Sequence, residues 1–171
     1  IYDRLRALKQ APQQVRAGAL RGAVLARGKE GIPLLIEAIR GEDYVLAAAA
    51  ARTSMELPGP EVTAALAAEL PKLPADKQVL LVNTLGRRGD GSAGPALLEL
   101  AAKGPDAVRL AAVRNVTHLG HAPAVGMLAE LALSGEGDLA AAARECLASF
   151  PAKDADATIA AMLNHKDAKV R

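Results

Sequence analysis

The side chains best suited to chemistry in this sequence are its three histidines and its single cysteine. His118 and His121 lie three residues apart in the stretch HLGH, and His165 lies much further along the chain. Two histidines without a carboxylate or a third histidine beside them do not complete the ligand set of a metal site. Gly120, which lies between them, predicts a helix end rather than a continuous helix face. We therefore expect no metal site and no cofactor.

Cys146 lies in the stretch AARECLASF, whose helical periodicity predicts a buried thiol that packs as a small apolar side chain. Glu145 beside it would point to another side of the helix. The glycine-rich stretch at residues 86–94, GRRGDGSAG, lacks the Lys-Ser/Thr pair of a phosphate-binding loop. These spacings assemble no acid, base and nucleophile, so the sequence predicts a protein that is not an enzyme.

Two further sets of residues recur at intervals of about 30 residues and could form binding surfaces if the chain stacks on itself. An acidic stripe would meet a basic partner, and its members are Glu37, Glu69, Glu99 and Glu130. A polar ridge on the opposite side would contain Arg21, Asn83, Arg87, Arg114 and His118. The alternative interpretation is that both sets are solvated helix faces that serve solubility, since Glu is a good helix former.

These intervals belong to a repeat that covers nearly the whole sequence. The phrase DAVR at residues 106–109 returns as DAKVR at residues 167–171, and its valine provides an anchor for alignment. The aligned anchors are 30 to 32 residues apart and fall at Val15, Val45, Lys77, Val108, Leu139 and Val170. This regularity predicts a repeat architecture. Lys77 fits least well, and we expect Val79 to take over its packing role.

Each repeat is predicted to contain two helices. Apolar residues recur at helical spacing in residues 106–119, and their stripe contains Val108, Ala111, Ala112, Val116 and Leu119. The stretch GHAP then ends one helix and begins the next. We expect first helices near 13–27, 45–56, 76–88, 106–119 and 138–149, and second helices near 31–41, 60–71, 92–103, 122–134 and 155–165. The Ala- and Leu-rich composition, with 2% aromatic residues, also favours an all-α fold.

The repeated phrase is interpreted as a joint between repeats rather than as a catalytic motif. An aspartate precedes each anchor from the second repeat onward, at Asp43, Asp76, Asp106, Asp138 and Asp167. An aspartate at the start of a helix can accept hydrogen bonds from the free N–H groups of the first turn. The arginine after the anchor, present as Arg16, Arg109 and Arg171, is expected to reach the aspartate of a neighbouring repeat.

A helix–turn–helix unit of about 31 residues that opens with D-x-V-R-x-x-A resembles the short HEAT-like repeats of the PBS-lyase type. The resemblance implies a right-handed α-solenoid of about five repeats, whose second helices line a concave face. Residues 1–12 would be the remnant of a preceding repeat, and the single array would contain repeats at 13–44, 45–75, 76–107, 108–138 and 139–169. The second and third repeats depart from the pattern, because they lack the arginine and because Pro71 and Pro74 lengthen the joint.

We expect a non-catalytic scaffold or spacer module whose partner is a protein of basic character. The resemblance also implies an alternative, an enzyme-associated or lyase-like subunit that holds a cofactor or chromophore, for which Cys146, His118 and Glu130 are the candidates. A third hypothesis is nucleic-acid binding, as in some HEAT-like DNA glycosylases. The formal net charge of +2 and the scarcity of aromatic side chains argue against nucleic acid.

The location and the ends of the chain are less constrained. No apolar run approaches the roughly 20 residues that a membrane span requires, so none is expected. A single cysteine excludes an internal disulfide and leaves the compartment open, cytoplasmic or extracytoplasmic. The start at Ile1 rather than Met predicts that the chain is part of a larger protein, which we expect to be of bacterial type. Neither end carries an evident cap, so we expect self-association through the ends.

Overall fold

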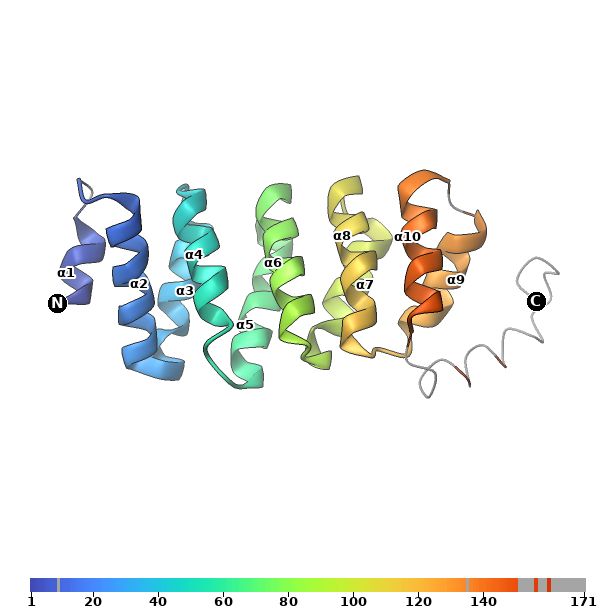
Figure 1. Ribbon diagram of the computed structural model, residues 1–171, viewed down its shortest axis with the longest axis horizontal. Helices are drawn as coiled ribbons and strands as arrows, with labels where there is room; N and C mark the ends of the chain where they lie inside the picture. Colours follow the sequence, from blue (N-terminus) through green and yellow to red (C-terminus); the bar gives the residue numbers. More distant parts are fainter. Residues whose placement is uncertain (9, 135, 151–155, 157–159, 161–171) are drawn as a thin grey trace. The chain divides into compact units, whose positions relative to one another are not determined.

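The computed structural model describes residues 1–8, 10–134 and 136–150, together with residues 156 and 160. Within these residues every regular element is a helix and none is a strand (Figure 1). This finding confirms the all-α prediction that was based on composition and periodicity. Apart from residues 156 and 160, the helix expected at 155–165 lies outside the described residues, as do His165, Asp167, Val170 and Arg171.

The helices follow the order that the repeat predicts. A short helix, α1 (Tyr2–Ala7), precedes them. The first helices are α2 (Gln13–Arg27), α4 (Tyr44–Ser54), α6 (Ala75–Arg88), α8 (Asp106–Val116) and α10 (Gly137–Ala148). The second helices are α3 (Ile32–Arg40), α5 (Pro60–Glu69), α7 (Gly94–Lys103) and α9 (Ala124–Ser134). Their boundaries lie close to the expected ones.

Glycine and proline set most of these boundaries. Gly120 has the left-handed backbone conformation that ends a first helix, with φ 58° and ψ 29°. Proline occupies the first turn of α3, α5 and α7, where its missing N–H costs no hydrogen bond. Short 3-10 turns extend several ends, at Gly28–Gly31, Leu70–Lys72, Gly91–Ala93 and Thr117–Leu119. They account for most of the small differences from the expected ranges, because helix ends commonly tighten in this way.

The chain forms two compact units, residues 1–84 and 85–171, which we call the N-terminal and the C-terminal unit; their boundary falls within α6. In the N-terminal unit α2 packs against α4, α3 packs against α5, and α3 also contacts α4. In the C-terminal unit α8 packs against α10, α7 against α8, and α9 against α10. First helices of neighbouring repeats therefore lie side by side within both units (Figure 1).

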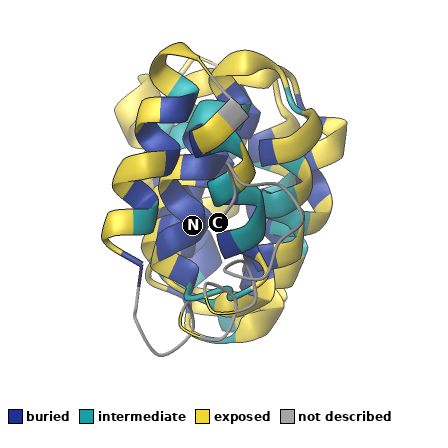
Figure 2. Ribbon diagram, turned by 90° about the vertical axis from the view of Figure 1, so that its right-hand side faces the viewer, coloured by how far each residue is buried: buried dark blue, intermediate teal, exposed yellow. Residues whose placement is uncertain are grey.

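Each unit buries aliphatic side chains between its helices. The stripe predicted for the fourth repeat is buried at all five positions, from Val108 to Leu119. Leu35 and Leu66 are fully buried in the N-terminal unit, as Leu97 and Leu128 are in the C-terminal unit. Full burial of one such side chain contributes roughly 1.5–3 kcal/mol. Figure 2 shows that buried positions follow one side of the helices and exposed positions the other.

The anchor positions do not share one environment. Val108 is fully buried, whereas Val15 and Val45 are 43% and 45% exposed. Lys77 is itself buried, and Val79 is half-buried. The expectation that Val79 would replace Lys77 in the packing is therefore wrong.

Backbone carbonyls explain how a lysine can occupy this buried position. The Lys77 ammonium donates hydrogen bonds to the carbonyls of Arg40 and Gly41, at the end of α3. The C-terminal end of a helix favours a cation, since the helix dipole places partial negative charge there. A buried ammonium that keeps its hydrogen bonds avoids most of the cost of leaving water.

Candidate functional site

The repeated phrase forms a contact between consecutive helices. In the third and fourth repeats, the side chain that follows the anchor donates to a main-chain carbonyl eight residues earlier, at the end of the preceding helix. Gln78 Nε2 lies 2.9 Å from the Leu70 oxygen, and Arg109 Nε lies 3.1 Å from the Ala101 oxygen. Hydrogen bonds of this kind cover carbonyls that a helix end leaves without a partner in its own helix.

The same contact recurs in the fifth repeat with a different donor. Ala140 stands after the anchor there, and Arg144 Nη2 instead donates to the Ala132 oxygen at 2.8 Å. The accepting carbonyls are those of Leu70, Ala101 and Ala132, which follow one another at 31-residue steps. The acceptor thus keeps its place in the repeat while the donor changes. We call this set the carbonyl joints.

One arginine also pairs with an aspartate of the next repeat. Arg16 Nη1 lies 3.3 Å from Asp43 Oδ2, between α2 and the start of α4. Asp43 Oδ1 accepts from the backbone N–H groups of Val45 and Leu46. Asp43 therefore caps α4 as predicted and also receives an arginine from the neighbouring repeat.

The fourth repeat departs from this arrangement. The carboxylate nearest to Arg109 is that of Asp106 in its own repeat, at 3.9 Å. Asp106 is fully exposed, and the residue that precedes α8 in the capping position is Pro105. The capping role predicted for Asp106 is wrong, because Pro105 has the extended backbone conformation of a cap and moves Asp106 into the helix itself.

One member of the expected acidic stripe, Glu69, is buried, whereas the other three are exposed. Glu69 is only 4% exposed and accepts from Arg40 at 2.6 and 2.8 Å and from Lys72 at 3.0 Å. The hydrogen bonds from Arg40 lower the pKa of Glu69 although burial alone would raise it. A covered and neutralised carboxylate cannot present charge to a partner, so an open acidic track does not extend over Glu69.

The other three glutamates are exposed on their second helices. Glu37 on α3 accepts from Arg6 of α1 at 3.3 Å. Glu99 on α7 and Glu130 on α9 belong to the C-terminal unit. These three remain candidates for contact with a partner, each within its own unit.

The residues of the expected polar ridge are all exposed. Arg21 forms a two-pronged ion pair with Glu56, with distances of 2.8 and 2.5 Å. This pair lowers the pKa of the Glu56 carboxyl through the Arg21 hydrogen bonds. Arg21 therefore adds little free charge to a ridge, whereas Arg87, Arg114 and His118 lie exposed on α6, α8 and the turn after α8.

The candidate reactive side chains do not converge. Cys146 is 7% exposed, as its helical stripe predicts, and its Sγ lies 3.2 Å from the Val113 oxygen. His118 is exposed and His121 is half-buried. Within the part of the chain that the structure describes, no three His, Cys, Asp or Glu side chains group closely enough to hold a metal ion. None of the described helices is long and apolar enough to cross a membrane.

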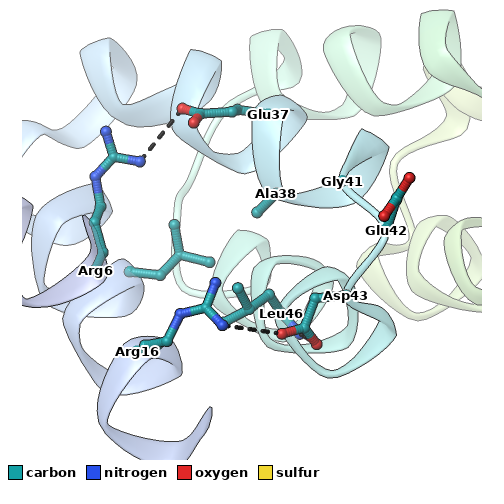
Figure 3. A pocket seen from close by; sticks show the side chains of 9 residues that line it. Arg6, Arg16, Glu37, Ala38, Gly41, Glu42, Asp43 and Leu46 are labelled. Atoms are coloured by element: carbon teal, nitrogen blue, oxygen red, sulfur yellow. Dashed lines mark hydrogen bonds and ion pairs between the residues drawn. The ribbon is translucent and has the colours of Figure 1, made fainter. Parts of the chain in front are cut away.

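The N-terminal unit contains an open cleft of about 390 Å³, lined by residues of α1 to α4 and of the α3–α4 connection (Figure 3). Its apolar lining consists of Leu20, Ala38 and Leu46. Its charged lining consists of Arg6, Arg16, Glu37, Glu42 and Asp43. Arg6 points toward Glu37 and Arg16 toward Asp43, while Glu42 lies on the side of the cleft away from Arg6 (Figure 3).

Of the residues that line this cleft, the sequence predicted roles for Arg16, Glu37 and Asp43, but not for Arg6 or Glu42. The available signal was the acidic pair Glu42–Asp43 directly after Gly41, where α3 ends. Comparison with known proteins assigns this geometry to no family: no protein-family model matches the chain, and no curated protein matches it significantly.

Proposed function

We propose that this chain is a non-catalytic helical-repeat scaffold that binds another protein. The observation that carries the proposal is the set of carbonyl joints at Leu70, Ala101 and Ala132, which recur with the period of the sequence. Contacts that repeat in this way are how repeat proteins stack their units. The proposal includes an arrangement of the short HEAT-like type, a right-handed α-solenoid of about five two-helix repeats.

The environments of the candidate reactive side chains support a non-catalytic role. A buried thiol against a carbonyl, as at Cys146, is poorly placed to attack a substrate or to carry a chromophore. His118 is exposed on another turn, so it does not form a nucleophile–base pair with that thiol. These positions weigh against the lyase-like alternative.

An exposed apolar patch supports a protein partner. Val15, Tyr44 and Val45 are 43%, 47% and 45% exposed at the starts of α2 and α4, which pack side by side. They are sequence neighbours of Arg16 and Asp43, which line the cleft. Large apolar side chains that gather at a surface mark interaction sites, and Tyr is enriched in interfaces. We call Val15, Tyr44 and Val45 the apolar patch.

Partner capture followed by reconstitution tests this function. The immobilised chain is used to isolate a partner, which is then purified and titrated against the chain by calorimetry. We expect the double variant Val15→Ser/Val45→Ser to weaken binding at least tenfold. The matched control is Leu133→Ser, which removes a similarly exposed apolar side chain from α9. Turnover of a small molecule by the purified chain, abolished in Cys146→Ser, would contradict the non-catalytic role.

A further inference from the structure

We propose that the cleft of the N-terminal unit binds a basic segment of the protein partner, with an arginine or lysine head placed against Glu42. The inference rests on the proposed function, because it assigns a partner chemistry to one site on the same scaffold. It depends on three features of the cleft: its uncompensated carboxylate, an unsatisfied hydrogen-bond donor and its apolar floor.

The charges that line the cleft leave one carboxylate without a partner. Arg6 is held by Glu37 and Arg16 by Asp43, each at 3.3 Å. Among the residues that the structure describes, Glu42 forms no hydrogen bond and no ion pair, and it is exposed. Three carboxylates therefore face two guanidiniums. The group that completes this set is a cation.

The neighbouring helix end does not supply that cation. The carbonyls of Arg40 and Gly41 are occupied by the ammonium of Lys77, which is buried and does not line the cleft. The positive charge of Lys77 therefore interacts with the end of α3 and does not face Glu42 across the cleft. Negative charge on Glu42 remains available at the surface beside it.

The second feature is a donor that lacks an acceptor. Arg16 Nε is buried and has no hydrogen-bond partner within the described residues. A buried donor without an acceptor is costly, and a ligand oxygen removes this cost when the partly exposed Arg16 side chain turns its guanidinium toward the cleft. A peptide offers main-chain carbonyls together with a cationic side chain. A metal ion offers only the positive charge, and an inorganic anion offers only acceptors.

The third feature is the apolar floor. Leu20, Ala38 and Leu46 line the cleft between its charged walls. The methylene stem of an arginine or lysine packs on such a surface while its head stays near a carboxylate. A volume of about 390 Å³ is small for a ligand site, and it suits one extended side chain with its adjoining peptide units.

A titration that is read residue by residue tests the inference. The ¹⁵N-labelled full chain is titrated with acetylated hexa-arginine or hexa-glutamate peptide at low salt, and amide chemical shifts are followed. We expect saturable shifts in residues 41–46 with hexa-arginine only. Glu42→Gln should weaken this binding about twofold to fivefold, as expected for the loss of one exposed charge pair. Glu145→Gln is the matched control, since Glu145 is an exposed glutamate on α10 that belongs neither to the cleft nor to the acidic stripe.

Each other result would overturn the assignment. Shifts with hexa-glutamate alone would reverse the charge of the ligand, and equal weakening by both variants would indicate binding to scattered carboxylates. The absence of shifts with hexa-arginine would show that the cleft does not bind a basic segment. A captured partner that loses affinity in Val15→Ser/Val45→Ser, but ignores Glu42→Gln and hexa-arginine, would refute the cleft and leave the scaffold function standing. A specific hexa-arginine site in a chain that binds no protein partner would support a cation site in the cleft and refute the scaffold function.

Discussion

Glu69 shows how one residue can lose its expected role to the repeat that precedes it. Its carboxylate is 4% exposed, and its strongest partner, Arg40, comes from α3. The sequence identifies Glu69 as one member of the acidic stripe. No pattern along the chain indicates that an arginine 29 residues earlier covers its carboxylate. The spacing of the acidic stripe therefore identifies equivalent positions correctly, but it gives no information on which of these glutamates remain exposed.

The first prediction concerns this carboxylate. Glu69→Gln should lower the free energy of unfolding at pH 7 by about 1–2 kcal/mol, because the hydrogen bonds from Arg40 and Lys72 lose their charged acceptor. Urea denaturation measures the change. Glu99→Gln, on an exposed glutamate, should alter the stability by less than about 0.5 kcal/mol. Equal losses in the two variants would show that the ion pairs of Glu69 contribute nothing.

The same pair makes a prediction about pH. Arg40 lowers the pKa of Glu69 below the ordinary glutamate value of 4.5, so folding favours the ionised carboxylate. The stabilisation is fully present above that ordinary value and is lost as the pH falls through the lowered one. The stability gap between the native chain and Glu69→Gln should therefore shrink on acidification below 4.5. A gap that stays constant down to about pH 2 would contradict the charged interaction.

At the scale of the helices, two glycines that look alike in the sequence differ in their packing. Gly18 on α2 has open space where a side chain would begin, with no atom within 4 Å of an added Cβ. An added Cβ on Gly86 of α6 would lie 2.6 Å from the Cβ of Asn115 on α8. Periodicity predicts both helices, but it cannot distinguish a glycine that the packing requires from one that it merely tolerates.

Alanine substitution separates the two cases. Gly18→Ala should stabilise the chain by about 0.5–1 kcal/mol, since alanine restricts the unfolded chain and favours helix. Gly86→Ala should destabilise it by about 1–3 kcal/mol, because α6 and α8 must move apart or Asn115 must leave its position. Thermal and urea unfolding of both variants measure the difference. Stabilisation by both substitutions would mean that the approach of α6 to α8 is not tight.

The carbonyl joints give a further prediction at this scale. Arg109→Ala removes the donor to Ala101 and should cost about 0.5–1.5 kcal/mol of stability, while partner affinity per folded molecule stays unchanged. Arg114→Ala is the control, because Arg114 is an exposed arginine on the same helix. Lost binding with unchanged unfolding would make Arg109 a contact residue and not part of a joint.

The helices themselves were the most predictable part of the fold. Apolar spacing, Gly120 and the prolines of the second helices were sufficient to place them, because these signals are local. The details that failed depend on neighbours. Pro105 takes the capping position that Asp106 was expected to hold, and carbonyls of α3 allow Lys77 to be buried.

At the scale of the whole molecule, the period identifies equivalent residues without giving their surroundings. Val15, Val45 and Val108 occupy one aligned position, yet only Val108 is buried. The cleft was not predictable for the same reason. It is lined by residues of four helices, and its pair Arg6–Glu37 joins positions 31 residues apart. Such a site becomes visible only when the stacking of the helices is known.

Local stability should be uneven across the N-terminal unit. α1 is a helix of six residues that packs on α2, whereas α3 contacts α2, α4 and α5. Because so short a helix does not persist without packing, the amides of α1 should exchange with solvent much faster than those of α3. Hydrogen exchange followed by mass spectrometry tests this order. Equal protection of α1 and α3 would contradict it.

The carbonyl joints have an evolutionary consequence. Their donors are the side chains of Gln78, Arg109 and Arg144, which differ in residue type or in position; their acceptors are main-chain oxygens, which every amino-acid substitution leaves in place. The acceptor of each contact therefore belongs to the main chain and does not depend on the residue type. A repeat protein built on such contacts can change most of its residues during evolution and keep the same packing of its helices. Its ancestry then becomes unreadable by residue identity long before its architecture changes.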